Sequence, residues 1–230
     1  MGHSAAFAAL LDESLAVSID RQAWLQELLG EADWQFDMGQ GTLTFTASDG
    51  RTLESRCQVL GTESVQSRTW LWGWANEGSA IPAALLQAGN AVRRFGMDSG
   101  IPELRERSLS LSTADGHVLA AVAGRLHPCA GYYRAPYEGG AMFVLLTSPT
   151  FVEPTPPILV RLTAGWARAI EVAGDQFSDH RRGLAAYARH LGLSHRDEGS
   201  SMVVSNADGA AVVSFDAEGR TTGISTTSGV

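Results

Sequence analysis

Residues 34–75 read WQFDMGQGTLTFTASDGRTLESRCQVLGTESVQSRTWLWGWA. Apolar and polar side chains alternate here with a period of two, which is typical of β-strands that bury one face. Short connections containing Gly or Ser separate four such runs, so we expect an antiparallel meander. Helices should cover one face of this sheet, and the other face should be largely wet.

Helical patterns surround this meander. The first thirty residues carry apolar side chains at helical spacing, either as one kinked helix or as two helices. The other predicted elements are helices at 81–95 and 113–126, a helical turn at 101–104 and a β-hairpin at 132–147. One-sided strands with segregated helices indicate an α+β fold and not a wound parallel sheet.

Four prolines between residues 149 and 157 mark the predicted linker. Two helices are predicted beyond it, at 158–173 and 178–191, followed by three short strands at 202–205, 211–215 and 221–226. We therefore predict an α+β sheet-and-helix domain over residues 1–150. A helix-helix-β-meander subdomain over residues 158–230 follows, either separate or part of the same core.

The composition excludes several classes of function. The formal net charge is −8, which argues against nucleic-acid binding because phosphates attract a basic surface. All 17 positively charged residues are Arg, so Schiff-base chemistry and the lysine-dependent phosphate loop are excluded. No apolar run reaches the roughly 18 residues of a membrane span, and no basic residue precedes the apolar N-terminal stretch as in a secretory signal. We expect a cytoplasmic protein that does not bind membranes.

The chemical motifs of common enzymes and metal sites are missing. GxSxG, HExxH and GxGxxG do not occur, and the histidines lack ligand spacing. Cys57 and Cys129 form no CxxC and are expected to be free thiols in a reducing compartment. Cys57 should be buried and inert, because it shares a strand face with Leu53 and Val59. We predict no catalytic residue, no metal and no cofactor.

Three tryptophans are the most unusual feature of the meander. Alternation places Trp70, Trp72 and Trp74 on one strand face. Each indole can bury about 150–250 Å², and monomers seldom expose apolar patches of the combined size. Either helices of the same chain cover the indoles, or the indoles line an aromatic groove for a ligand or partner. Asn76, just beyond, either caps the next turn or belongs with Trp72 to that groove.

The predicted hairpin carries a second aromatic cluster, YYRAPYE at residues 132–138. Tyr and Arg are enriched at protein interfaces. Tyr133, Arg134 and Tyr137 are therefore candidates for contact with a partner or ligand. The alternative is that they pack a partly buried edge strand.

Several segments resemble those of a known family. They are LGT at 60–62, TWLWGWAN at 69–76, GIPEL at 100–104, YYRAPY at 132–137, DHRR at 179–182 continuing to Gly192-Leu193, and FDAEGR at 215–220. Together they resemble the bacterial family known as domain of unknown function 6882, over nearly the whole chain. The resemblance implies a bacterial cytoplasmic protein with no assigned activity, and it supplies no catalytic residues.

The resulting hypothesis is non-catalytic binding to a protein partner, of an immunity-like or regulatory kind. Small size, acidity and the lack of catalytic motifs favour it. The alternative is an enzyme or small-ligand-binding protein with an aromatic pocket between sheet and helices. A cleft holding a perturbed carboxylate or His would favour that alternative. The oligomeric state stays open.

Overall fold

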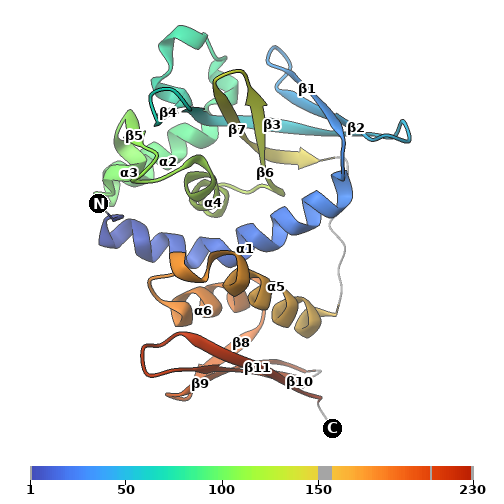
Figure 1. The fold of residues 1–230 in the computed structure, drawn as a ribbon, viewed down its shortest axis with the longest axis vertical. Coiled ribbons are helices and arrows are strands. Elements are labelled where there is room, and N and C mark those ends of the chain that lie inside the picture. Colours follow the sequence, from blue (N-terminus) through green and yellow to red (C-terminus); the bar gives the residue numbers. More distant parts are fainter. Residues whose placement is uncertain (1, 150–156, 208, 229–230) are drawn as a thin grey trace. The chain divides into compact units, whose positions relative to one another are not determined.

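A computed structural model describes residues 2–149, 157–207 and 209–228 (Figure 1). The fold is α+β, as predicted. The chain divides into two compact units, and each is described by itself. The first contains residues 1–7 and 21–153, and the second contains residues 8–20 and 154–230. The predicted linker falls on residues 150–156, which lie outside the described residues.

A single helix, α1 (Ala5–Leu29), occupies most of the first thirty residues. Ser4 caps its start, because the Phe7 N–H donates to the Ser4 hydroxyl at 3.3 Å. Ser4 in turn donates its N–H and its hydroxyl to the Glu103 carboxylate, at 2.5 and 2.8 Å. Gly30 ends the helix with a φ of 54°, which a side chain would disfavour. Of the two predicted alternatives, the continuous helix is the one observed.

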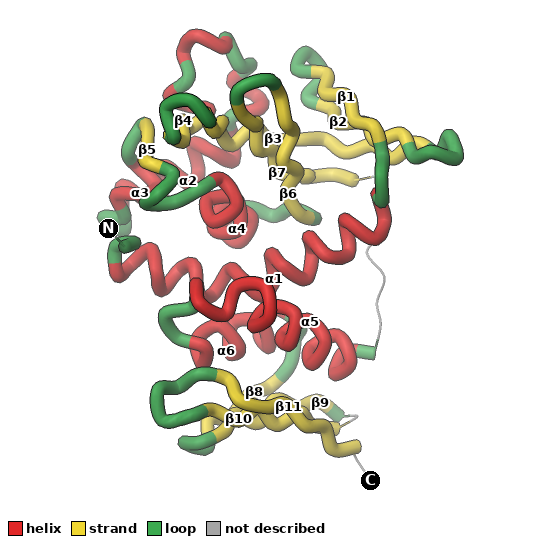
Figure 2. The backbone as a smooth tube through the Cα atoms, in the orientation of Figure 1, coloured by secondary structure: helices red, strands yellow, loops and turns green. Residues whose placement is uncertain are grey.

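An antiparallel sheet forms the first unit's centre, in the order β1-β2-β3-β4-β5, with β7 pairing β3 and β6 (Figure 2). The long strand β3 pairs with β2 and then β4 along one edge and with β7 along the other. The predicted meander is confirmed, although β5 was not expected. The strands are β1 (Asp33–Asp37), β2 (Thr42–Thr46), β3 (Thr52–Ser64), β4 (Thr69–Trp72), β5 (Ser108–Ser110), β6 (Gly131–Tyr137) and β7 (Gly140–Pro149).

Helices of the first unit pack against the middle of this sheet. They are α2 (Gln87–Asp98) and α4 (Gly116–Leu126), while the short helix α3 (Pro102–Arg105) packs on α2. Both α2 and α4 contact β3, and α4 also contacts β7. The consecutive residues 143–146 of β7 are all fully buried, so the sheet is covered on both faces there. At the edge strand β1, Asp33 and Asp37 are exposed, so the face expected to be largely wet is wet at this edge but covered in the middle of the sheet.

The tryptophan stripe is shorter than predicted. Strand β4 ends at Trp72, and residues 73–75 form a 3₁₀ turn, so Trp74 leaves the strand. Trp70 and Trp72 are 0% exposed, and their rings meet in a T-shaped contact at 5.3 Å. The Arg93 guanidinium lies over the half-buried Trp74 at 4.2 Å. The chain itself therefore covers Trp70 and Trp72, and the prediction of one three-indole face is wrong.

The second unit contains the two predicted helices, α5 (Ile158–Ala173) and α6 (His180–His190), and a separate antiparallel sheet. Its strands are β8 (Ser194–Asp197), β9 (Ser201–Asn206), β10 (Gly209–Phe215) and β11 (Thr221–Ser228), in the order β11-β10-β9-β8. This is four strands instead of the predicted three. The missed strand, β8, is wholly exposed and shows no apolar alternation. Helix α5 packs on β10 and β11, and α6 packs on β8.

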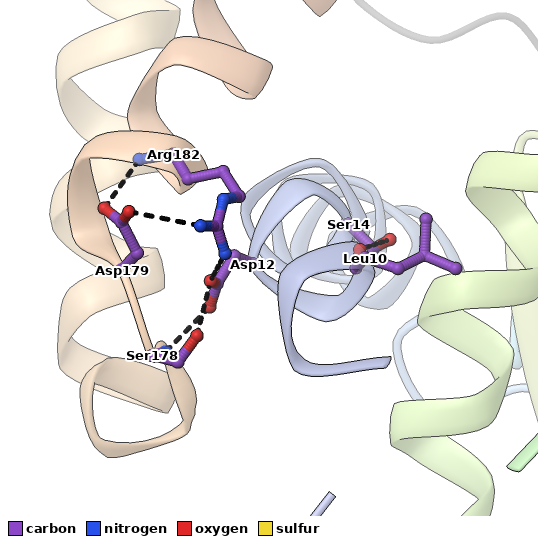
Figure 3. A network of polar contacts seen from close by, with 6 residues as sticks. All are labelled: Leu10, Asp12, Ser14, Ser178, Asp179 and Arg182. Atoms are coloured by element: carbon purple, nitrogen blue, oxygen red, sulfur yellow. Dashed lines mark hydrogen bonds and ion pairs between the residues drawn. The ribbon is translucent and has the colours of Figure 1, made fainter. Parts of the chain in front are cut away.

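A buried carboxylate connects two segments of the second unit (Figure 3). Asp12 is 0% exposed and accepts hydrogen bonds from the N–H and the hydroxyl of Ser178, both at 2.7 Å. The Arg182 guanidinium donates to the same carboxylate at 3.0 Å and also pairs with Asp179 at 3.5 Å. Asp12 thus joins residues 8–20 of α1 to the start of α6.

Both cysteines are free thiols, as predicted. Cys57 is buried in a cluster with Leu43 and Val59, and burial raises the pKa of its thiol to about 12. Its thiol therefore stays protonated at neutral pH, and only the thiolate is a good nucleophile. Burial also raises the pKa of the Cys129 thiol.

Candidate functional site: an aromatic pocket beside strand β6

A pocket of about 390 Å³ opens within the first unit. Its wall comes from the last turns of α1, the neighbourhood of β1 and β2, the start of α4, and β6. We call it the tyrosine pocket. Its lining residues are Gln22, Leu25, Gln26, Leu29, Gly30, Ala32, Phe45, His117, Tyr132, Tyr133 and Arg134.

The position of β6 explains why this pocket exists. Among the described strands β6 pairs with β7 alone, so its other edge needs cover. The Gln22 amide of α1 reaches that edge and donates to the Tyr132 carbonyl oxygen at 2.9 Å. Because the pocket lies along the strand edge, side chains from both faces of β6 contribute to its wall.

Aromatic rings form the apolar floor. The Tyr133 ring makes edge-on contacts with Phe45, at 4.9 Å between ring centroids, and with Trp34, at 5.9 Å. Aromatic ring pairs favour such edge-on geometries, so Phe45 and Trp34 help to fix the orientation of the Tyr133 ring. Leu25 and Leu29 of α1 continue this apolar surface. A flat apolar group is therefore a suitable occupant.

The polar groups of the pocket are mainly hydrogen-bond donors. Burial, and secondarily the negative charge of Asp115, raises the pKa of Tyr132, and burial raises the pKa of Tyr133. Both phenols thus stay neutral at physiological pH, and their O–H groups can donate a hydrogen bond. The Tyr132 hydroxyl lies 2.8 Å from His117 Nδ1. The Arg134 guanidinium reaches Glu63 only at 3.9 Å and remains 40% exposed.

The charge of the lining contrasts with that of the chain. Although the formal net charge is −8, none of the residues lining the tyrosine pocket is acidic. Arg134 supplies a permanent positive charge. The lining holds no Ser, Thr or Cys. Its hydroxyl beside a base is the Tyr132 phenol, 2.8 Å from His117 Nδ1, and burial raises the pKa of that phenol and so disfavours the phenolate. The arrangement suits binding of an anionic or hydrogen-bond-accepting group.

The structure separates the predicted site residues. Tyr133 and Arg134 line the pocket, whereas Tyr137 is 49% exposed and donates its hydroxyl to the Glu63 carbonyl at 3.4 Å. Trp72 belongs to the core, and its indole N–H donates to the Glu103 carbonyl at 3.3 Å. Asn76 lies between two 3₁₀ turns and makes no side-chain cap, so the capping alternative is wrong.

Gln22, Phe45 and His117 complete the pocket and were not predicted from the sequence. These residues belong to three elements far apart in the chain, and no spacing rule connects them. Within residues 2–149, 157–207 and 209–228, no group of three or more His, Cys, Asp or Glu side chains is placed to hold a metal ion. In the same ranges, no helix combines the length and the apolar character needed to cross a bilayer.

The fold and the site define an α+β protein with a ligand-sized pocket between a helix and a sheet edge. Comparison with known families then identifies the chain. It belongs to the family of unknown function DUF6882, whose sequence profile matches residues 8–149. The match ends before α5, so the similar segments at 179–193 and 215–220 lie outside it. No curated protein and no solved structure matches the chain.

Proposed function

We propose that this chain is a non-catalytic binding protein whose tyrosine pocket holds a small organic anion with a flat apolar body. The observation that carries the proposal is the pocket's composition: an aromatic floor, an arginine at the rim and no acidic lining residue in an acidic chain. This is the small-ligand alternative from the sequence, without its catalytic part. It is supported by the hydrogen-bond donors of the lining and by the raised pKa of the Tyr132 phenol, which disfavours a reactive phenolate.

Arg134 is expected to supply much of the selectivity. A hydrogen bond to a charged group contributes about 1.5–3 kcal/mol, which corresponds to roughly tenfold or more in Kd. The aromatic floor should bind the flat body whether or not the charge is present. The contributions of the ligand's charge and of its flat apolar body to the binding affinity can therefore be measured separately.

We expect the anionic dye anilinonaphthalene sulfonate to bind the wild-type chain, and Arg134→Gln to weaken that binding about tenfold. The neutral analogue phenylnaphthylamine has the same flat body without the sulfonate. Its affinity should be nearly equal for wild type and variant. Fluorescence titration measures both dyes.

Arg51→Gln is the matched control, because Arg51 is an exposed arginine of the first unit that pairs with Asp49 at 2.6 Å. It should bind both dyes as the wild type does. Thermal melting shows whether each variant stays folded. The proposal is wrong if the wild type binds neither dye, or if both substitutions weaken the anionic dye equally.

A protein partner is the second candidate function, and the tip of the β6–β7 hairpin favours it. Tyr137 is 49% exposed, and Val65, in the neighbouring β3–β4 turn, is 66% exposed. The Val65 N–H donates to the Gly139 carbonyl at 2.9 Å, so the two turns are held together. Large exposed side chains on a turn that is held in place by a hydrogen bond are suited to contact with an immunity-like or regulatory protein partner.

A double substitution, Val65→Ser with Tyr137→Ser, tests this second function. Both side chains are exposed, so we expect an unchanged melting temperature and the loss of any partner that co-purifies one-to-one with the wild type. Arg134→Gln is the comparison, because it alters the pocket and leaves both tip side chains in place. Retention of the same partner by the tip variant would contradict the idea.

A bacterial, cytoplasmic setting is part of the proposal. It is supported by the family resemblance and by two free thiols, which are typical of reducing compartments. The acidic composition supports the expectation that neither nucleic acid nor an anionic membrane surface is the partner.

A further inference from the structure

The sheet of the second unit ends in an unprotected strand. Among the described strands β11 pairs with β10 alone, so one row of its backbone N–H and C=O groups has no strand partner. Natural proteins usually protect such edges with charged side chains, proline or bulges that turn the strand away. Strand β11 reads TTGISTTS and contains no charge and no proline. Its register irregularity against β10 lies at its start, beside Phe215, and residues 223–228 pair regularly.

Apart from β6 and β11, the described edge strands are charged or short. Strand β8, at the opposite side of the same sheet, contains Arg196 and Asp197. Strand β1 of the first unit contains Asp33 and Asp37. Strand β5 pairs with β4 alone and carries no charge, but it is three residues long. Strand β11 is both uncharged and eight residues long, and this combination favours pairing with another strand.

We infer that β11 pairs antiparallel with β11 of a second copy of this chain, across a two-fold axis. A strand without charge is complementary to itself, because no like charges meet when two copies pair. The second unit, residues 8–20 and 154–230, contains seven arginines and eleven acidic residues, and two of the acidic residues, Asp12 and Asp20, pair with Arg182 and Arg161. Strand β11 itself adds no charge to the edge.

Pairing of two β11 strands would bury more of the apolar side chain of Ile224. This residue lies opposite Val213 of β10, which is 1% exposed, and cross-strand partners share a sheet face. Ile224 itself is only half-buried, because no strand follows it on the outer side. Pairing would bring the two copies of Ile224 onto one continuous face and close both edges, which prevents further growth.

The test compares Ser225→Lys on β11 with Ser194→Lys on β8, since both serines are on edge strands and exposed. We expect a wild-type mass near twice the chain mass of 24.4 kDa by sedimentation. Ser225→Lys should give the mass of a single chain, because it puts a positive charge on each of the two paired strands. Ser194→Lys should behave as the wild type does.

Hydrogen exchange supplies a second readout that needs no substitution. The amides of β11 should become more protected as wild-type concentration rises, and those of β8 should not. Circular dichroism confirms that the variants are folded. A single-chain wild type, a dimer that Ser194→Lys breaks instead, or β11 protection independent of concentration would each overturn the inference.

Discussion

We expect Trp72→Ala to lower the free energy of unfolding by about 3–5 kcal/mol. The side chain is 0% exposed, so the substitution removes a whole indole from a closed core and leaves a cavity. It also removes the contact with Trp70 at 5.3 Å and leaves the Glu103 carbonyl without the indole N–H at 3.3 Å. Chemical denaturation followed by circular dichroism measures the loss.

Trp74→Ala is the matched control, since it deletes the same side chain from the 3₁₀ turn two residues further on. Trp74 is only half-buried under Arg93, so water can fill much of the vacated space. We expect a loss less than half that of Trp72→Ala. Equal losses would contradict the assignment of Trp72, and not Trp74, to the closed core.

The second large effect is expected from Asp12→Ala, at about 3 kcal/mol. The change leaves the N–H and hydroxyl of Ser178 without the acceptor that holds both at 2.7 Å. It also removes the buried partner of Arg182. Arg182 is 38% exposed, so water can solvate its guanidinium in the variant. The expected loss of stability therefore lies at the lower end of the range for breaking a buried ion pair.

Asp197→Ala supplies the comparison, because Asp197 also pairs with an arginine of α6 but is 51% exposed. Exposed ion pairs contribute about 0–1 kcal/mol, so this variant should be nearly neutral. Urea denaturation of both variants gives the difference. If the two substitutions cost the same, the Asp12 network does not stabilise the second unit as we infer.

Local patterns predicted most elements because each is encoded within a few neighbouring residues. Period-two alternation predicted β1 to β4, and helical spacing with the Gly30 stop predicted α1. The same reasoning failed for β8 and β5, which are short and bury little surface of their own. Neighbouring strands impose their conformation by pairing, and a pairing partner is invisible in a local pattern.

The tryptophan stripe shows how a local rule fails at the end of an element. Alternation holds only while the chain stays extended, and the chain turns at residue 73. Alternation alone predicted Trp74 beside Trp72, because Gly73 by itself did not identify the end of β4. The sequence left two alternatives for the indoles: cover by the same chain, or an aromatic groove for a ligand or partner. Because Trp70 and Trp72 are fully buried, the structure shows the first for these two residues.

The sequence alone determined the α+β class, the antiparallel meander, the free thiols and the absence of common catalytic motifs. These properties depend on composition or on residues close together in the chain. Only the tertiary structure decided that Tyr133 and Arg134 meet Gln22, Phe45 and His117 around one pocket, while Trp72 and Asn76 do not. Those residues come together because α1, β2, α4 and β6 pack around the same core, and packing partners are chosen by shape and burial over the whole unit.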